Sequence, residues 1–188
     1  GEKHFSIASV SEEMYDRTIL INGMSKAFAM TGWRMGYAAG PKSIIKAMTS
    51  LQSHTTSNAN SIAQKAGYEA LVNPERDKAV ADMVAQFAER RDYMVSAINS
   101  IDLLSCPIPK GAFYVMLNIS KTFGKSIDGI TLMNSTDFAD QLLEKKKVAV
   151  VPGVAFGNEN FVRLSYATSM ANIREGLERI SEFVKTLK

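Results

Sequence analysis

The amino-acid sequence predicts an α/β protein in which the end of a large α/β domain is followed by a small α+β domain. Two short apolar runs typical of strands lie near the start, a helical pattern of unusual length lies in the middle, and strands and helices are mixed after Gly111. We therefore expect three parts. Residues 1–73 form the C-terminal part of the large domain, residues 74–100 a long interdomain helix, and residues 101–188 the small domain.

The first part is predicted to contain two strands that flank a loop. Residues 18–21 (TILI) are β-branched and apolar, and Asn22-Gly23 is a turn signal, so we expect a buried strand that ends there. Residues 35–39 form a second apolar run, which Gly40-Pro41 closes. Residues 25–34 are accordingly predicted to be a loop between the two strands.

Apolar residues at helical spacing predict the next elements. Pro41 suits the first turn of a helix, which the pattern extends to about Leu51. Residues 52–60 are rich in Ser, Thr and Asn and are expected to form a loop, and residues 61–71 return to the helical pattern. The pattern at residues 74–99 is longer than most globular helices and is long enough to connect two domains.

The last part is predicted to alternate irregularly between strands and helices. A proline-rich turn at residues 106–109 precedes a strand, and a glycine-containing connection then runs through Gly129. Such an order is typical of a small α+β domain. The expected strands are residues 112–118, 148–151 and 160–165, and the expected helices are residues 136–146 and 169–187.

Composition and charge argue against several classes of protein. The 188 residues are 46% hydrophobic and 22% charged, as in an ordinary globular protein. The net charge is +3, and the Lys and Arg residues are spread along the chain, which argues against nucleic-acid binding. The one dense cluster of lysines, residues 145–147, is expected to be a solvated helix end. No apolar run is long enough to cross a bilayer, so no membrane partner is expected.

The single cysteine, Cys106, cannot form an internal disulfide, and no Cys/His spacing suggests a metal site. A reducing compartment such as the cytoplasm is therefore expected, with no metal. Cys106 has no charged neighbour and is expected to be an inert thiol. His4 and His54 are lone histidines, and structural or solvent-facing roles are expected for both.

The most informative segment is residues 25–37, SKAFAMTGWRMGY. A lysine at the end of a buried strand is poorly solvated, which lowers its pKa and favours the neutral amine that attacks an aldehyde. Ser25 can offer a hydroxyl to a phosphate oxygen, and Arg34 can bind the same phosphate through two nitrogens. Alone, Lys26 would more often point into water and Arg34 form a surface ion pair, but together they favour a site for a phosphorylated aldehyde.

Four other residues of this segment have simpler interpretations. Gly32 and Gly36 would allow the backbone to approach a bound group, because glycine has no Cβ. Trp33 and Tyr37 are expected to pack in a core rather than touch a cofactor.

The longer segment SKAFAMTGWRMGYAAGP closely resembles the cofactor-lysine motif of the class I and II aminotransferases, in particular the bacterial aspartate and aromatic aminotransferase-like group. The segments QSHTTSNANSIAQ, KGAFYVMLNIS, VAVVPGVAFG and NFVRLSYATS resemble later segments of the same family, in the same order. The resemblance implies the C-terminal half of a fold type I transferase that depends on pyridoxal 5′-phosphate. Lys26 would then form the Schiff base with the cofactor, and Ser25 and Arg34 would hold its phosphate.

Arg163, in NFVRLSYATS, would by the same resemblance bind the α-carboxylate of the amino-acid substrate. From the residues alone, Arg163 lies in a strand between Val162 and Leu164, so its side chain points to the face opposite theirs. An ion pair and a carboxylate site both remain open there, although the planar guanidinium is best suited to the second. Tyr114 resembles a position near the substrate entrance and is not expected to be catalytic.

The resemblance implies transfer of an amino group between an L-amino acid and a 2-oxo acid. A homodimer is also implied, because the segment around His54 resembles one near the family's dimer interface. Family members are about twice this length, and the half preceding Gly1 would carry further cofactor-binding groups, so the chain alone is expected to be an inactive C-terminal fragment. Two alternatives stay open: a C–S lyase, decarboxylase or synthase on the same scaffold, or an aminotransferase-like regulatory domain.

Overall fold

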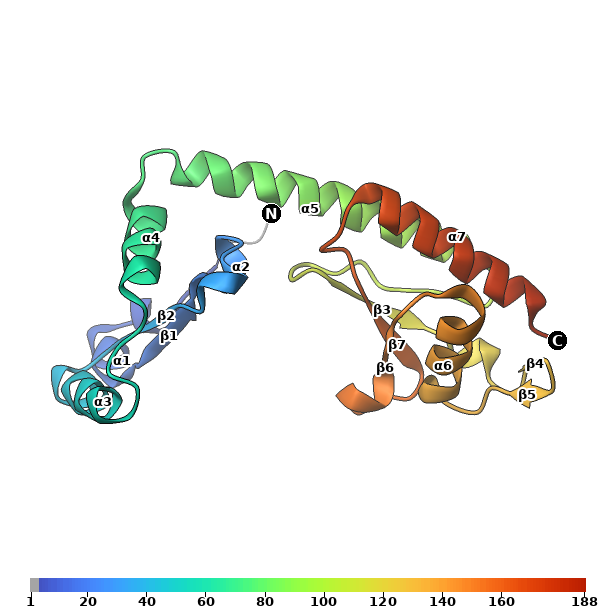
Figure 1. The fold of residues 1–188 in the computed structure, drawn as a ribbon, viewed down its shortest axis with the longest axis horizontal. Coiled ribbons are helices and arrows are strands. Elements are labelled where there is room, and N and C mark those ends of the chain that lie inside the picture. The colour runs from blue at the N-terminus through green and yellow to red at the C-terminus, as the bar shows by residue number, and fades with distance from the viewer. Residues whose placement is uncertain (1–3) are drawn as a thin grey trace. The chain divides into compact units, whose positions relative to one another are not determined.

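The structure is a computed structural model that describes residues 4–188. The chain divides into two compact units, which we call unit 1 (Gly1–Asp82) and unit 2 (Met83–Lys188). The boundary falls inside the long helix α5 (Arg76–Asn99), so this helix begins in unit 1 and ends in unit 2 (Figure 1). Residues 1–3 of the expected first domain lie outside the described residues.

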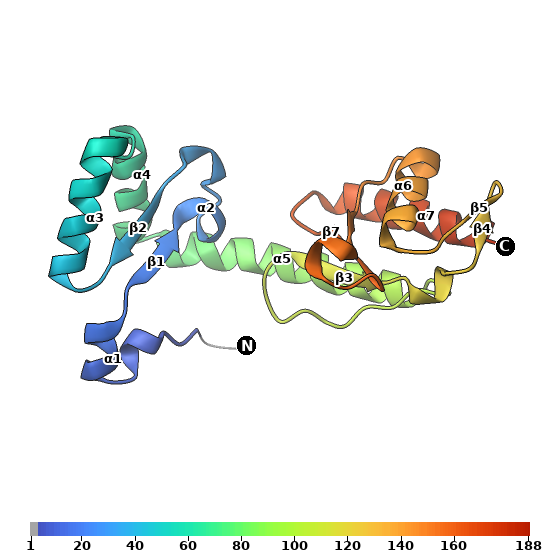
Figure 2. The same ribbon diagram turned by 90° about the horizontal axis from the view of Figure 1, so that it is seen from below.

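Unit 1 is built on an antiparallel two-stranded ribbon, in which β1 (Leu20–Gly23) pairs with β2 (Gly36–Ala39). The short helix α2 (Met24–Ala27) lies at the end of this ribbon (Figure 2). Asn22 and Gly23 continue the strand instead of forming the expected turn, and the expected loop contains α2 and a 3-10 turn. The remaining elements of the unit are α1 (Glu12–Arg17), α3 (Lys42–Thr55), α4 (Ser61–Val72) and the 3-10 turns Ile7–Ser9 and Thr31–Trp33.

Side-chain hydrogen bonds set the ends of these helices. The side chain of Ser11 caps α1, and the Asn60 Oδ1 atom accepts hydrogen bonds from the Ile62 and Ala63 amides at the start of α4. Helix α3 extends to Thr55, so the expected loop at residues 52–60 is shorter than predicted. Its Ser and Thr hydroxyls donate to carbonyl oxygens one turn back, as Thr55 does to Leu51, so these hydroxyls have partners within the helix.

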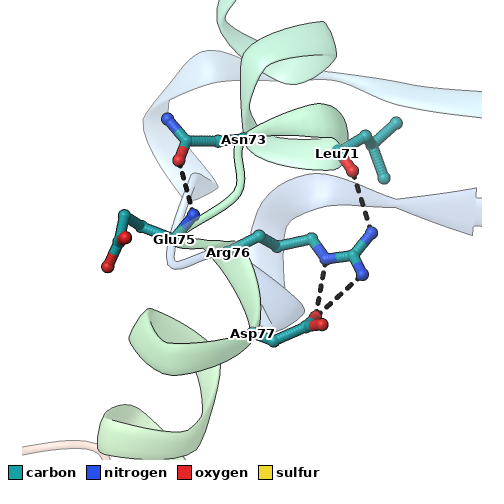
Figure 3. A network of polar contacts seen from close by, with 5 residues as sticks. All are labelled: Leu71, Asn73, Glu75, Arg76 and Asp77. Atoms are coloured by element: carbon teal, nitrogen blue, oxygen red, sulfur yellow. Dashed lines mark hydrogen bonds and ion pairs between the residues drawn. The ribbon is translucent and has the colours of Figure 1, made fainter.

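A polar network fixes the turn between α4 and α5 (Figure 3). The Asn73 Oδ1 atom accepts a hydrogen bond of 2.8 Å from the Glu75 amide, and Arg76 Nη1 donates to the Leu71 carbonyl oxygen at 2.9 Å. Arg76 also pairs with the Asp77 carboxylate at 2.8 Å. Helix α5 therefore starts at Arg76, just after Pro74, where the sequence predicted its beginning.

Unit 1 buries few side chains in this chain. Its buried apolar residues are Met24, Met30 and Ala63. The prediction that the first strand is buried is wrong, because Ile21 is 78% exposed. Trp33 and Tyr37, expected in a core, are 45% and 36% exposed. A ribbon of two strands cannot enclose its own faces, and one short layer of helices leaves much of it uncovered.

Unit 2 contains a three-stranded antiparallel sheet in the order β3-β7-β6. Arg163 in the central strand β7 (Phe161–Ser165) lies opposite Met116 of β3 (Tyr114–Asn118) and Val151 of β6 (Val151–Pro152). The other elements are α6 (Ser135–Lys146), α7 (Met170–Thr186), the hairpin strands β4 (Ser126–Ile127) and β5 (Ile130–Thr131), and the 3-10 turns Ser120–Thr122 and Gly153–Phe156. The second of these turns is labelled η4 below.

A single apolar core holds unit 2 together. The end of α5, one face of the sheet, α6 and α7 all contribute to it, and the Phe138 and Phe183 rings meet edge to face at 5.4 Å. Alternate residues of β7 are buried, as period-two patterning requires. The largest fully buried side chains of this unit are Tyr166, Phe138, Phe183, Ile98, Leu117, Ile119, Leu132, Leu142, Ile180, Val115 and Val162.

Two segments of unit 2 differ from the prediction. Residues 148–151 were expected to be a strand, but only Val151 pairs, while Val148 and Val150 pack against the core without strand hydrogen bonds. The expected connection through Gly129 contains the β4–β5 hairpin. Its turn residues Asp128 and Gly129 have φ angles of 49° and 82°, which is the conformation that an Asp-Gly pair favours in a two-residue hairpin.

The lysine cluster ends a helix, as predicted, but its members are not simply solvated. Lys145 pairs with Asp128 at 2.8 Å, and Lys146 pairs with Glu182 at 2.7 Å. Lys147 ends α6 in the left-handed conformation. The cluster thus ties α6 to the hairpin turn and to α7.

Candidate functional site

Lys26 lies in α2, directly after the first strand of the ribbon. Met24, which is fully buried, anchors this helix, and its amide donates a 3.1 Å hydrogen bond to the carbonyl oxygen of Met35, just before β2. Ser25 is half-buried, but Lys26 is exposed. The expectation of a poorly solvated lysine is therefore wrong for this chain, because the strand that precedes it is itself uncovered.

Arg34 lies at the same end of the ribbon. Gly23 is paired with Gly36 in the β1–β2 ribbon. Gly23 precedes α2, and Gly36 follows Arg34 by two residues. Arg34 has φ 52° and ψ 45°, an uncommon left-handed conformation for a residue with a side chain, and it turns the chain into β2. Its Nη1 atom donates to the Thr31 carbonyl oxygen at 3.0 Å. No carboxylate among residues 4–188 pairs with it, so a surface ion pair is not observed.

The glycines of this segment differ from one another. A Cβ on Gly36 would lie 2.9 Å from the Asn22 carbonyl oxygen, so the approach of the partner strand already requires a glycine there. Nothing lies within 4 Å of a Cβ atom placed on Gly32. The Tyr37 hydroxyl accepts a 3.3 Å hydrogen bond from the Asn22 side chain, so this exposed tyrosine is tied to the neighbouring strand.

Residues that carry a primary amine, a hydroxyl and a guanidinium thus lie at one end of a two-stranded ribbon. This donor set fits a phosphorylated aldehyde, because an amine reacts with an aldehyde and a hydroxyl and a guanidinium are strong donors to phosphate oxygens. Pyridoxal 5′-phosphate is a ligand of this chemistry.

A second group of candidate residues lies in unit 2, around Arg163. Val162 and Leu164 are buried on one face of β7, and Arg163 is half-buried on the other, as the sequence predicted. Its guanidinium carbon lies 4.1 Å from the centroid of the Tyr114 ring and 4.5 Å from that of Phe156. Tyr114 comes from the adjacent strand β3 and Phe156 from the end of η4.

The Arg163 environment favours a carboxylate site over an internal ion pair. Aromatic rings stabilise the guanidinium through its face, and leave the N–H groups along its edge able to donate in the plane. No carboxylate of residues 4–188 forms an ion pair with Arg163. Sequence reasoning missed Phe156, although the segment VAVVPGVAFG that carries it had been singled out.

The remaining candidates are not parts of either group. His4 and His54 are exposed. Burial raises the pKa of the Cys106 thiol, which keeps it protonated and agrees with an inert role. Over residues 4–188, no group of three or more His, Cys, Asp or Glu side chains is arranged to hold a metal ion, and no helix has the length and apolar character to span a membrane.

Comparison with known proteins gives consistent matches over nearly the whole chain. A family model described as aminotransferase class I and II matches residues 1–180. A bifunctional aspartate aminotransferase and glutamate/aspartate-prephenate aminotransferase of Petunia hybrida is 45% identical over 187 residues, which are 98% of this chain and 39% of that protein. A probable aspartate/prephenate aminotransferase of Rickettsia bellii is 44% identical over 181 residues, 96% of this chain and 45% of that protein.

Solved structures resemble the fold equally closely. An aspartate aminotransferase from Rhizobium meliloti has a TM-score of 0.93 and 43% identity, with 100% of this chain and 47% of that chain covered. An aromatic aminotransferase from Pyrococcus horikoshii has a TM-score of 0.85 and 38% identity, and the match covers 98% of this chain and 47% of that chain. The chain therefore spans less than half the length of these relatives.

Proposed function

Since the chain belongs to the class I and II aminotransferases, we propose that it is part of a longer aminotransferase that moves an amino group between an L-amino acid and a 2-oxo acid. The observation that carries this proposal is the family match over residues 1–180, with an amine, a hydroxyl and a guanidinium at one end of the β1–β2 ribbon. The names of the relatives point to aspartate as the amino acid to test first.

The family depends on pyridoxal 5′-phosphate, which when bound supplies the aldehyde that accepts the amino group and the ring that withdraws electrons. In our proposal the Lys26 amine would hold the cofactor through its aldehyde group, and would be the base that moves a proton at the substrate Cα atom. The Ser25 hydroxyl and the Arg34 guanidinium donate to the phosphate oxygens. The hydrogen bond from Arg34 Nη1 to the Thr31 carbonyl oxygen limits the positions that this guanidinium can take.

Arg163 binds the carboxylate of the substrate in this proposal. Its guanidinium offers two parallel N–H donors to the two oxygens, and the rings of Tyr114 and Phe156 restrict its orientation. Two donors to one carboxylate hold the substrate in a single orientation.

The chain alone is proposed to be inactive. It covers 39% and 45% of the two curated relatives described above, and Lys26 is exposed in it, so water can reach the amine. Exclusion of water is part of how such sites work.

Covalent labelling tests the role of Lys26. The complete protein that contains this chain is incubated with pyridoxal phosphate and reduced with borohydride, and its peptides are analysed by mass spectrometry. We expect the pyridoxyl group on Lys26 of the unmodified protein. The variant K26A should have neither this label nor transaminase activity. The control K46A removes another exposed lysine, on α3, and should keep both. Labelling elsewhere with Lys26 unmodified would refute the assignment, and strong labelling and transamination by the 188-residue chain alone would refute its inactivity.

A substrate panel tests the reaction type. Purified complete protein is given acidic and aromatic amino acids with 2-oxoglutarate, and the products are separated by chromatography. Amino-group exchange is the expected outcome. Release of carbon dioxide or sulfide without formation of a new amino acid would instead support a lyase or decarboxylase.

We also propose that the complete protein is a homodimer in the cytoplasm. The dimer rests on the resemblance of the His54 segment to the family's interface region, and the compartment on the presence of a single cysteine. Light scattering during gel filtration and fractionation of cells that make the protein test the two statements. A monomeric mass or recovery outside the cytoplasm would contradict them.

A further inference from the structure

A buried serine at the start of α6 connects this helix to the loop before β7. Ser135 is fully buried, and both its Oγ (2.6 Å) and its backbone N–H (3.0 Å) donate to the same oxygen of the Glu159 carboxylate. The Ser135 Oγ atom in turn accepts a 3.2 Å hydrogen bond from the amide of Val154, in η4. Ser135 therefore bridges Glu159 and η4 from a position that water does not reach.

The loop that carries Phe156 is closed on itself. The Asn158 amide donates to the Gly153 carbonyl oxygen at 3.1 Å, and the Gly157 amide donates to that of Val154 at 3.0 Å. A Cβ on Gly153 would overlap the carbonyl oxygens of Asn158 and Phe161. Because the loop is this tight, the bonds at Ser135 fix the position of the whole turn, including Phe156 at its end.

We propose that Ser135 and Glu159 are positioning residues, which hold the Phe156 ring against Arg163 and so set the affinity of Arg163 for the substrate carboxylate. This inference rests on the proposed function of Arg163. Without the acceptor at Glu159, the buried Ser135 loses the partner of two donors, so its hydroxyl is no longer held in the orientation in which it accepts from the Val154 amide, and η4 is held less firmly against α6. The ring then leaves the guanidinium, which regains rotamers that do not face a carboxylate.

Steady-state kinetics of the complete protein with L-aspartate and 2-oxoglutarate provide the first measurement. We expect E159A and S135A each to raise KM about fivefold, the order of one lost hydrogen bond, with kcat changed less than about twofold. E159Q keeps an oxygen that can accept both bonds and should restore a KM close to that of the unmodified protein. The matched control E175A truncates an exposed glutamate that pairs with Arg179 on α7, and should have no effect.

The second measurement follows Arg163 directly. The rings near the guanidinium shift the Nε–H resonance of Arg163, which is assigned by its disappearance in R163K. E159A and S135A should move this resonance towards the position of an unstacked arginine, and E159Q and E175A should leave it in place. Thermal unfolding of each variant shows whether it is folded. If S135A does not fold, E159A by itself still tests the proposal.

The outcomes separate this inference from the function it rests on. If R163K leaves KM unchanged, the carboxylate-binding role of Arg163 is wrong. If R163K raises KM but E159A changes neither KM nor the Arg163 resonance, the positioning role is wrong. The positioning role is also wrong if E159Q is as impaired as E159A, or if the resonance moves while KM does not.

Discussion

Arg163 lies against two aromatic rings, Tyr114 and Phe156. Its guanidinium carbon lies 4.1 Å from the Tyr114 ring centroid and 4.5 Å from that of Phe156, and no carboxylate among residues 4–188 forms an ion pair with it. A lysine would keep the charge but lose the planar pair of donors and the stacking.

For the complete protein, R163K should therefore raise KM for L-aspartate roughly tenfold to a hundredfold, as loss of charged hydrogen bonds worth about 1.5–3 kcal/mol implies. Steady-state kinetics give the value. The control R174K changes an arginine that stacks on Tyr93 at 4.2 Å, outside the candidate site, and should have little effect. Equal effects of the two changes would argue against a special role of Arg163.

Two glycines of unit 2 should respond in opposite ways to alanine. G153A places a Cβ onto the carbonyl oxygens of Asn158 and Phe161, and should destabilise unit 2 by about 1–3 kcal/mol, as overpacking does. Gly176 lies within α7 with nothing within 4 Å of a Cβ, so G176A should stabilise the helix by up to about 1 kcal/mol. Urea denaturation measures both, and a neutral G153A would show that the loop adapts.

At the scale of elements, α6 illustrates how one helix separates core from surface. Leu142 is fully buried in the unit 2 core, whereas its neighbour Leu143 is 48% exposed. L142A should cost about 2–5 kcal/mol, while L143A should cost well under half as much, because only the first leaves a cavity. Urea unfolding of unit 2 tests the pair, and equal losses would contradict the burial described here.

The ion pairs at the end of α6 predict sensitivity to acid. Hydrogen bonding and charge attraction from Lys145 hold the pKa of Asp128 below its ordinary value of 3.8, and Lys146 does the same for Glu182, whose ordinary pKa is 4.5. Both carboxyls take up protons more readily in the unfolded chain. Their contribution to the free energy of unfolding is therefore complete above the ordinary pKa values, and it is lost as the pH falls through the lower pKa values of the folded state. The pairs are exposed, so the effect should be small and sensitive to salt.

Denaturation of unit 2 at several pH values from about 6 down to 3 tests this prediction, since that range spans the ordinary carboxyl pKa values. The double change D128N/E182Q should flatten the dependence of stability on pH in this range. D140N, on the exposed face of α6, is the control and should leave the slope unchanged. A slope unaltered by the double change would show that these pairs do not contribute.

At the scale of the whole molecule, the two units differ in how much apolar surface they cover. Unit 2 has a continuous core, but unit 1 buries only a few side chains and exposes several large ones, including Ile21 (78%), Ile62 (69%) and Leu51 (68%). Because the chain is less than half the length of its relatives, we expect the rest of the protein to cover unit 1.

Hydrogen exchange followed by mass spectrometry tests this expectation. In the 188-residue chain, amides of β1 and β2 should exchange faster than those of β3 and β7 by at least tenfold, because a two-stranded ribbon opens easily. In the complete protein, protection of β1 and β2 should rise towards that of unit 2. Equal protection of both units in the isolated chain would mean that unit 1 is stable without further residues.

The sequence by itself predicted the family, the order of most elements and the face of β7 that carries Arg163, because local patterning and a long motif are properties of consecutive residues. It also contains the Asp128-Gly129 turn signal of the β4–β5 hairpin, in a segment where an irregular connection was predicted. Only the tertiary structure decided that Lys26, Trp33 and Tyr37 are exposed in this chain, and that Phe156 and Tyr114 meet Arg163. The physical reason is that burial and stacking depend on which distant segments pack together, and residue spacing does not encode that.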